Sequence, residues 1–190
     1  MKETASQGRY KRLAANVFGV TMLVLAVLVT LETLLRKLFS ISIGGVDELA
    51  GYSIAVGAPL SFAVTSLERS HIRINLLYLF FRPRMKAWVD VLSILSIGVM
   101  AVFLLAFTVK TVLETQAYQS VAQTPWATPL IYPQLVWLAS MVVFLVPALM
   151  LPARAIYLFY QGRESTVIQE FGPDSPEAEL KAELEDLKRR

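Results

Sequence analysis

Four long apolar stretches alternate with polar and charged segments along the chain. At a helical rise of about 1.5 Å per residue, each stretch of about 19 residues covers about 28 Å, close to the hydrocarbon thickness of a bilayer. Lipid offers no hydrogen bonds to the backbone, so stretches of this length predict α-helices rather than isolated strands. No Asp, Glu, Lys or Arg interrupts any of them. The four stretches are Leu13–Leu31, Leu49–Leu67, Val91–Val109 and Pro133–Leu151.

The pattern predicts an all-α membrane protein with one transmembrane domain, residues 1–160, and one cytoplasmic tail, residues 161–190. Between the second and third stretches, segment 68–84 has a short apolar middle with basic flanks, which predicts an interfacial helix or a re-entrant elbow. In the tail, Ser175-Pro176-Glu177 predicts the start of a short cytoplasmic C-terminal helix. The four predicted transmembrane helices cover about residues 13–35, 47–67, 88–110 and 131–153.

Basic residues are distributed unevenly between the two sides of these predicted helices. Short loops rich in Lys and Arg stay in the cytoplasm, so the richer side is predicted to be the inner one. Only Arg36, Lys37 and Lys110 fall on the other side. Both termini are therefore predicted in the cytoplasm, and the pI near 9.2 reflects topology rather than nucleic-acid binding. The residues counted on the inner side are Lys2, Arg9, Lys11, Arg12, Arg69, Arg73, Arg82, Arg84 and Lys86, and Arg154 and Arg163 after the fourth stretch.

The second predicted helix carries two candidate contact features. Asp47 and Glu48 open it, and carboxylates in a first turn interact favourably with the helix dipole. A charged helix start is therefore favoured over a contact with a partner. Ser53, Gly57 and Ser61 recur at every fourth position and predict a face of small side chains on which another helix packs closely. That other helix belongs either to this bundle or to a different subunit.

Residues that carry chemistry are sparse. The absence of cysteine excludes disulfides, thioether-linked haem and iron–sulfur clusters. His71 is the only histidine, which excludes haem held by two histidines. We expect His71 and Arg73 to form hydrogen bonds at the inner headgroup layer. Because membrane enzymes and self-sufficient transporters usually need ionisable residues inside the bundle, the sequence predicts an accessory or scaffold subunit without a catalytic, substrate or metal site.

The loop from Glu114 to Tyr132 carries Pro125, Trp126 and Pro129. Prolines stop helices, and Trp and Tyr favour the headgroup layer, so this loop is predicted to lie at the outer surface of the bilayer. A docking surface for a soluble partner is the alternative interpretation.

Three segments occur in a characteristic order: Arg36-Lys37-Leu38-Phe39, Asp47-Glu48-Leu49 and His71-Ile72-Arg73-Ile74-Asn75-Leu76-Leu77. In order and spacing they resemble the small membrane subunit (DctQ-like) of tripartite ATP-independent periplasmic (TRAP) transporters. The resemblance extends over residues 10–160, whereas the tail after Gly162 lies outside it. That family commonly has an aromatic residue where this chain has Val46 and an aspartate where it has Asn75. If these positions contact another subunit, the contacts differ here.

The resemblance implies a sodium-driven importer of an organic acid in the bacterial inner membrane. A periplasmic binding protein (DctP-like) delivers the acid to a large multi-span membrane subunit (DctM-like), and the small subunit enlarges and holds the static scaffold. No cofactor is implied on this chain: sodium is expected on the partner subunit, and a bound phospholipid is the one ligand that this interpretation allows. The candidate positions for subunit contacts or interfacial anchoring are Arg36, Asp47, Glu48, Ser53, Gly57, Ser61, His71, Arg73 and Asn75.

Two other classes of protein remain open. One is a small multidrug-type exporter that works as a homodimer with Glu32 as its proton-coupling carboxylate, although Glu32 is predicted at a membrane edge. The other is a quinone- or haem-binding membrane anchor of a redox complex.

Overall fold

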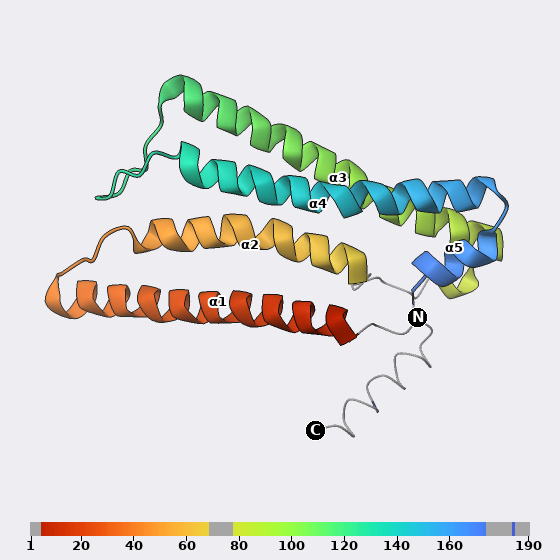
Figure 1. The fold of residues 1–190 in the computed structure, drawn as a ribbon, viewed down its shortest axis with the longest axis horizontal. Coiled ribbons are helices and arrows are strands. Elements are labelled where there is room, and N and C mark those ends of the chain that lie inside the picture. Colours follow the sequence, from red (N-terminus) through yellow and green to blue (C-terminus); the bar gives the residue numbers. More distant parts are fainter. Residues whose placement is uncertain (1–4, 69–77, 174–183, 185–190) are drawn as a thin grey trace. The chain divides into compact units, whose positions relative to one another are not determined.

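The computed structural model describes residues 5–68, 78–173 and residue 184. This part of the chain consists of helices joined by loops, with one isolated β-bridge, between Val121 and Pro129 (Figure 1). Its elements are the α-helices α1 (Ala5–Phe39), α2 (Val46–Glu68), α3 (Pro83–Tyr118), α4 (Ile131–Tyr160) and α5 (Glu164–Phe171), and the short 3₁₀ helix η1 (Tyr78–Phe80).

Four of the helices are long and apolar enough to cross a membrane, which confirms the number predicted from the sequence. The helices extend beyond the apolar stretches. α1 continues past Glu32 until Ser40 adopts a positive φ of 55° and turns the chain out of the helix. α3 begins at Pro83, because a proline in the first turn has a suitable φ and lacks only an N–H that would have no partner there. Polar residues can continue a helix through the headgroup layer, where water satisfies their side chains.

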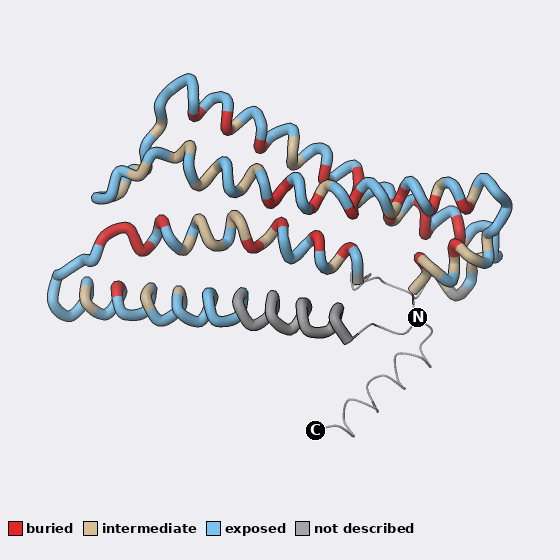
Figure 2. Tube along the Cα trace, viewed as in Figure 1, coloured by how far each residue is buried: buried red, intermediate tan, exposed pale blue. Residues whose placement is uncertain are grey.

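The chain divides into two compact units, which are described separately. The first contains Met1–Phe62 and Leu104–Phe144. Here the rings of Phe62 and Phe144 pack at 5.7 Å between centroids. Side chains of α1 are described from Phe18 onwards, and only 6% of its most apolar part is buried (Figure 2). Most of this surface is therefore available to lipid or to another protein.

The second unit contains Ala63–Phe103 and Leu145–Arg190, and its core forms where α5 packs against α3 and α4. Val167 and Phe171 of α5 are almost fully buried. The rings of Trp88 and Phe159 pack edge to face nearby, at 5.5 Å between centroids. The remaining core side chains are Ala87, Val91, Ile94, Ala155 and Leu158.

Ion pairs hold α5 on both neighbouring helices. Arg154 of α4 donates from Nε and Nη2 to the two carboxylate oxygens of Glu170, at 2.9 and 2.8 Å. Arg84 of α3 lies 3.4 Å from the Glu164 carboxylate. A bidentate pair fixes orientation as well as distance, so α5 is held at both ends.

α5 was not predicted, since the sequence indicated a cytoplasmic tail from residue 161 onwards, with a helix only after Ser175. An eight-residue helix is marginal on its own, and here the apolar residues Val167 and Phe171, four positions apart, dock on other helices. The predicted elbow lies mostly outside the described residues, apart from its final part, which forms η1. Most of the predicted C-terminal helix also lies outside them; Leu184 is helical and exposed.

We predict that Phe171→Ala releases α5. Truncation of a buried aromatic side chain destabilises its surroundings by about 3–5 kcal/mol. The exposed Arg163 then becomes a faster site for trypsin, which limited proteolysis of the purified chain measures by mass spectrometry. Gln169→Ala, at an exposed position of the same helix, is the matched control and leaves the cleavage rate unchanged. Equal cleavage of the Phe171→Ala variant and the parent would contradict the assigned role.

Candidate functional site

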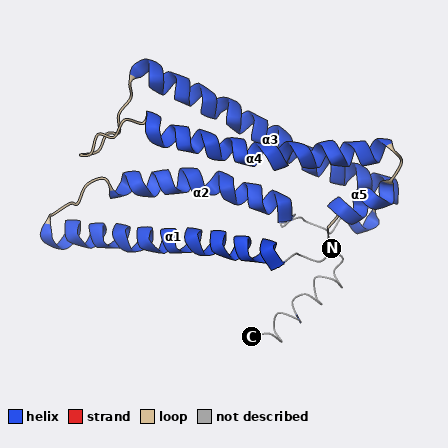
Figure 3. Ribbon diagram, in the orientation of Figure 1, coloured by secondary structure: helices blue, strands red, loops and turns tan. Residues whose placement is uncertain are grey.

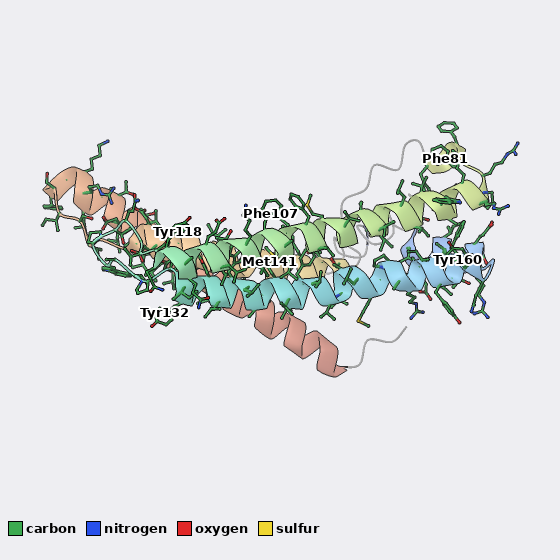
Figure 4. The ribbon with its side chains drawn as sticks, turned by 90° about the horizontal axis from the view of Figure 1, so that it is seen from above. Phe81, Phe107, Tyr118, Tyr132, Met141 and Tyr160 are labelled. Atoms are coloured by element: carbon green, nitrogen blue, oxygen red, sulfur yellow. The ribbon has the colours of Figure 1, made fainter. Side chains whose placement is uncertain are left out.

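The loop pair is formed by residues 40–45, which join α1 to α2, and residues 119–130, which join α3 to α4 (Figure 3). Tyr118 and Tyr132 flank the second loop at this end of α3 and α4 (Figure 4). Three backbone hydrogen bonds close that loop on itself: Ala122 N–H to Thr128 O, Ala127 N–H to Thr124 O, and Leu130 N–H to Ser120 O, at 2.9 to 3.1 Å. The loop is therefore a defined turn structure rather than an open connection.

Gly44 and Gly45 join the two loops. Both have a positive φ, 69° and 71°, a region that side-chain-bearing residues rarely adopt. A Cβ atom added at Gly44 would lie 3.2 Å from the Pro125 ring, and one at Gly45 would overlap the indole ring of Trp126. The absence of side chains at this glycine pair thus lets the second loop lie directly on the first.

Glu32 of α1 holds the first loop in place through hydrogen bonds. Its carboxylate is buried and accepts hydrogen bonds from Ser42 Oγ at 2.5 Å, the Ile43 backbone N–H at 2.8 Å and Arg36 Nη2 at 2.9 Å. Ser42 Oγ also accepts from the Gly44 N–H at 3.2 Å. Because a buried carboxylate is stabilised by multiple hydrogen bonds, Glu32 fixes the path of the chain into the glycine pair.

Glu48 provides a second buried carboxylate in the same unit. Tyr52 donates its hydroxyl proton to Glu48 Oε2 at 2.9 Å, and the Thr128 side chain is a further hydrogen-bond partner of Tyr52. The contact ties the second loop to the first turns of α2. Among the described side chains, buried polar atoms without a hydrogen-bond partner occur only in this unit, at Glu48 Oε1, Thr124 Oγ1 and Gln134 Oε1.

The other predicted positions on α1 and α2 differ in their surroundings. Arg36 is paired with Glu32 and lies 4.0 Å from Asp47, which is largely exposed. In the small-residue series, Gly57 is buried against the ring of Phe18, Ser53 is half-buried and Ser61 is exposed. Within this chain, the close helix contact of that series is therefore made at Gly57.

His71, Arg73 and Asn75 lie outside the described residues, and their predicted anchoring role stays a prediction. At the end of the same segment, Tyr78 donates its hydroxyl proton to Asp90 Oδ2 at 2.7 Å. Asp90 is buried, and Lys86 Nζ lies 5.2 Å from the centroid of the Tyr78 ring. The start of α3 is thus tied to η1 by a buried polar contact in the second unit.

Several of these residues were not candidates in the sequence analysis, notably Ser42, Tyr52, Tyr78 and Thr128. Their partners lie on other turns or loops, so only the folded chain identifies them. Among the residues that were missed, Asp90 could have been identified most easily from the sequence, because it is a carboxylate in the first turns of a long apolar helix. In the described part of the chain, no group of three or more His, Cys, Asp or Glu residues could hold a metal ion. The polar side chains that the fold brings together instead hold loops and helix starts in place.

The four apolar helices, with buried polar side chains engaged near their ends, define a multi-pass α-helical membrane protein. A comparison with protein families then identifies the kind of membrane protein. Residues 25–159, most of the chain, match the DctQ component of tripartite ATP-independent periplasmic transporters. The chain belongs to this family and is a component of a transporter rather than an enzyme. No curated protein and no solved structure is a significant match to it.

Membership in this family makes the chain the small membrane subunit of a TRAP transporter and a multi-pass protein of the inner membrane. It also implies, in general terms, a large membrane subunit (DctM) and a binding protein (DctP) as partners.

We predict that Gly45→Ala destabilises the first unit. The left-handed backbone conformation alone disfavours a residue with a side chain by about 1–2 kcal/mol, and the overlap with Trp126 adds to this. Thermal unfolding of the purified chain in detergent measures the effect. Gly51→Ala is the control, because Gly51 lies in α2 with no neighbouring atom within 4 Å of an added Cβ. If both variants unfold at the temperature of the parent, the loop contact does not stabilise this unit.

Proposed function

We propose that the chain is the non-catalytic scaffold subunit of a secondary transporter that imports an organic acid using a sodium gradient. In this proposal the large membrane subunit binds sodium and moves the substrate, and a periplasmic binding protein delivers it. The family match carries the proposal. The small subunit contributes a fixed helical support and binds neither substrate nor coupling ion.

The hydrogen bonds of two buried carboxylates, one in α1 and one in α3, favour a scaffold role for this chain. Glu32 accepts hydrogen bonds from three groups of its own chain, and Asp90 accepts one from Tyr78. A carboxylate that carries protons or ions must exchange partners during each cycle. Glu32 instead holds the first loop, and Asp90 holds the start of α3 against η1. Their hydrogen bonds therefore suit a structural role rather than the transfer of protons or ions.

Exposed apolar surface supports a partner within the membrane. Along α1, side chains such as Val20, Leu23 and Leu38 are more than three-fifths exposed. Helices associate in lipid through close packing, and a helix that buries little of itself in its own chain has its surface free for that purpose. This surface suits a second membrane protein, with lipid covering what that protein leaves exposed.

Co-expression with a large membrane subunit (DctM) tests the proposal. We expect an affinity-tagged copy of this chain to retain the large subunit through detergent purification, and sodium-dependent uptake to require both chains and the binding protein in reconstituted vesicles. Vesicles that contain only this chain show no uptake. Uptake by this chain alone, lost in Glu32→Gln, would establish the exporter alternative instead.

We also propose that both termini are cytoplasmic, as the distribution of basic residues indicates. The chain lacks cysteine, so single cysteines report their side without background. In whole cells, we expect a membrane-impermeant maleimide to label Gln123→Cys, in the second loop of the loop pair, and not Ser165→Cys, in α5, unless the cells are opened. Both positions are exposed, which makes them a matched pair. The reverse labelling pattern would invert the topology.

A further inference from the structure

Arginine side chains gather where α3 and α5 begin in the second unit. Arg82 and Arg84 lie at the start of α3, and Arg163 immediately precedes α5. The pair between Arg84 and Glu164, the first residue of α5, joins the two helix starts. We refer to Arg82, Arg84 and Arg163 as the arginine group.

These arginines retain hydrogen-bond donors. Arg84 contacts Glu164 through Nε, at 3.4 Å from Oε1, and its side chain is 80% exposed. Arg163 is exposed and makes no side-chain hydrogen bond to the start of α5, and Arg82 is also exposed. A guanidinium has five N–H donors in a planar fork, so one contact with a carboxylate does not saturate it.

Aromatic side chains surround this end of the second unit. Phe80 is 85% and Tyr160 is 86% exposed, and Trp88 and Tyr157 are more than half exposed. Phe81 and Tyr160 are seen at the same end of the unit in Figure 4. Exposed Trp and Tyr at the ends of membrane-spanning helices mark the depth of the lipid headgroups. The arginine group therefore lies at the level of the phosphates rather than in open water.

We infer that the arginine group binds the phosphate of an anionic phospholipid headgroup. Arg84 and Arg163 provide the direct contacts, Arg82 adds positive charge, and Glu164 positions Arg84. Bidentate recognition of phosphate suits guanidinium groups, and the exposed aromatic side chains contact the glycerol and upper acyl region of the same lipid. The inference goes beyond the scaffold role and rests on the proposed function only for the leaflet, which is the cytoplasmic one.

Lipid is the occupant that the surroundings favour. These arginines share their level with aromatic and apolar side chains that face outwards along membrane-spanning helices, and such surroundings suit a lipid headgroup rather than a soluble phosphate compound. Basic residues near an anionic leaflet each contribute about 1 kcal/mol, or about fivefold in affinity.

Native mass spectrometry of the full-length chain in detergent tests the inference, with phosphatidylglycerol and phosphatidylcholine as the two probes. We expect the parent chain to prefer phosphatidylglycerol, and Arg84→Gln/Arg163→Gln to bind it about 25-fold more weakly while its binding of phosphatidylcholine is unchanged. Lys110→Gln is the matched control, because Lys110 is also exposed, lies on α3 and pairs with a carboxylate, that of Glu114 at 3.7 Å.

A charge-conserving variant separates binding from folding. Arg84→Lys/Arg163→Lys keeps the positive charges but loses the guanidinium forks, so it is expected to bind phosphatidylglycerol more tightly than the glutamine pair and more weakly than the parent. Equal binding of the two lipids by the parent, an equal loss in Lys110→Gln, or displacement of phosphatidylglycerol by excess inorganic phosphate would each overturn the lipid assignment. None of these outcomes changes whether the chain retains the large subunit, so a failure here is distinct from a failure of the proposed function.

Discussion

Lipid supplies no hydrogen bonds, and each polar group within the long helices therefore depends on a partner from the chain itself. Thr108 illustrates this constraint in α3, where its fully buried hydroxyl donates to Leu104 O at 2.9 Å. Glu32 and Asp90 need stronger partners, and they obtain them from the first loop and from η1. The positions of these connecting segments thus follow from the need to satisfy carboxylates that lie within long helices.

The two units meet this requirement with different contacts. In the first, a glycine pair with positive φ lets Pro125 and Trp126 lie on the loop that Glu32 holds. In the second, α5 adds apolar side chains and two ion pairs to the ends of α3 and α4. In both units the polar contacts and ion pairs described here lie near the ends of helices. The apolar sides of helices such as α1 are left largely uncovered. In each unit, ends of helices are thus held firmly while apolar sides of helices are left to contact lipid or another membrane protein.

This distribution of contacts fits the part of a transporter that stays fixed. The chain belongs to the DctQ family, whose members serve as components of a larger assembly. Its buried carboxylates hold loops and helix starts, and its exposed cations lie near the ends of helices, where phosphate groups are available. The proposed scaffold role requires firm attachment to both protein and membrane, and the arginine group would contribute the second of these.

The sequence by itself determined the number and approximate place of the four long helices, because apolar length in a bilayer is a local property. Three short segments were sufficient to indicate the family, and the match over residues 25–159 confirms it. Only the tertiary structure decided what Glu32 does, since its partners lie up to 11 residues further along the chain. It also decided that α5 forms, because eight residues become a stable helix when Val167 and Phe171 are buried in a core shared with residues of α3 and α4. Such contacts join residues distant in sequence, and no local pattern of apolar and polar positions specifies them.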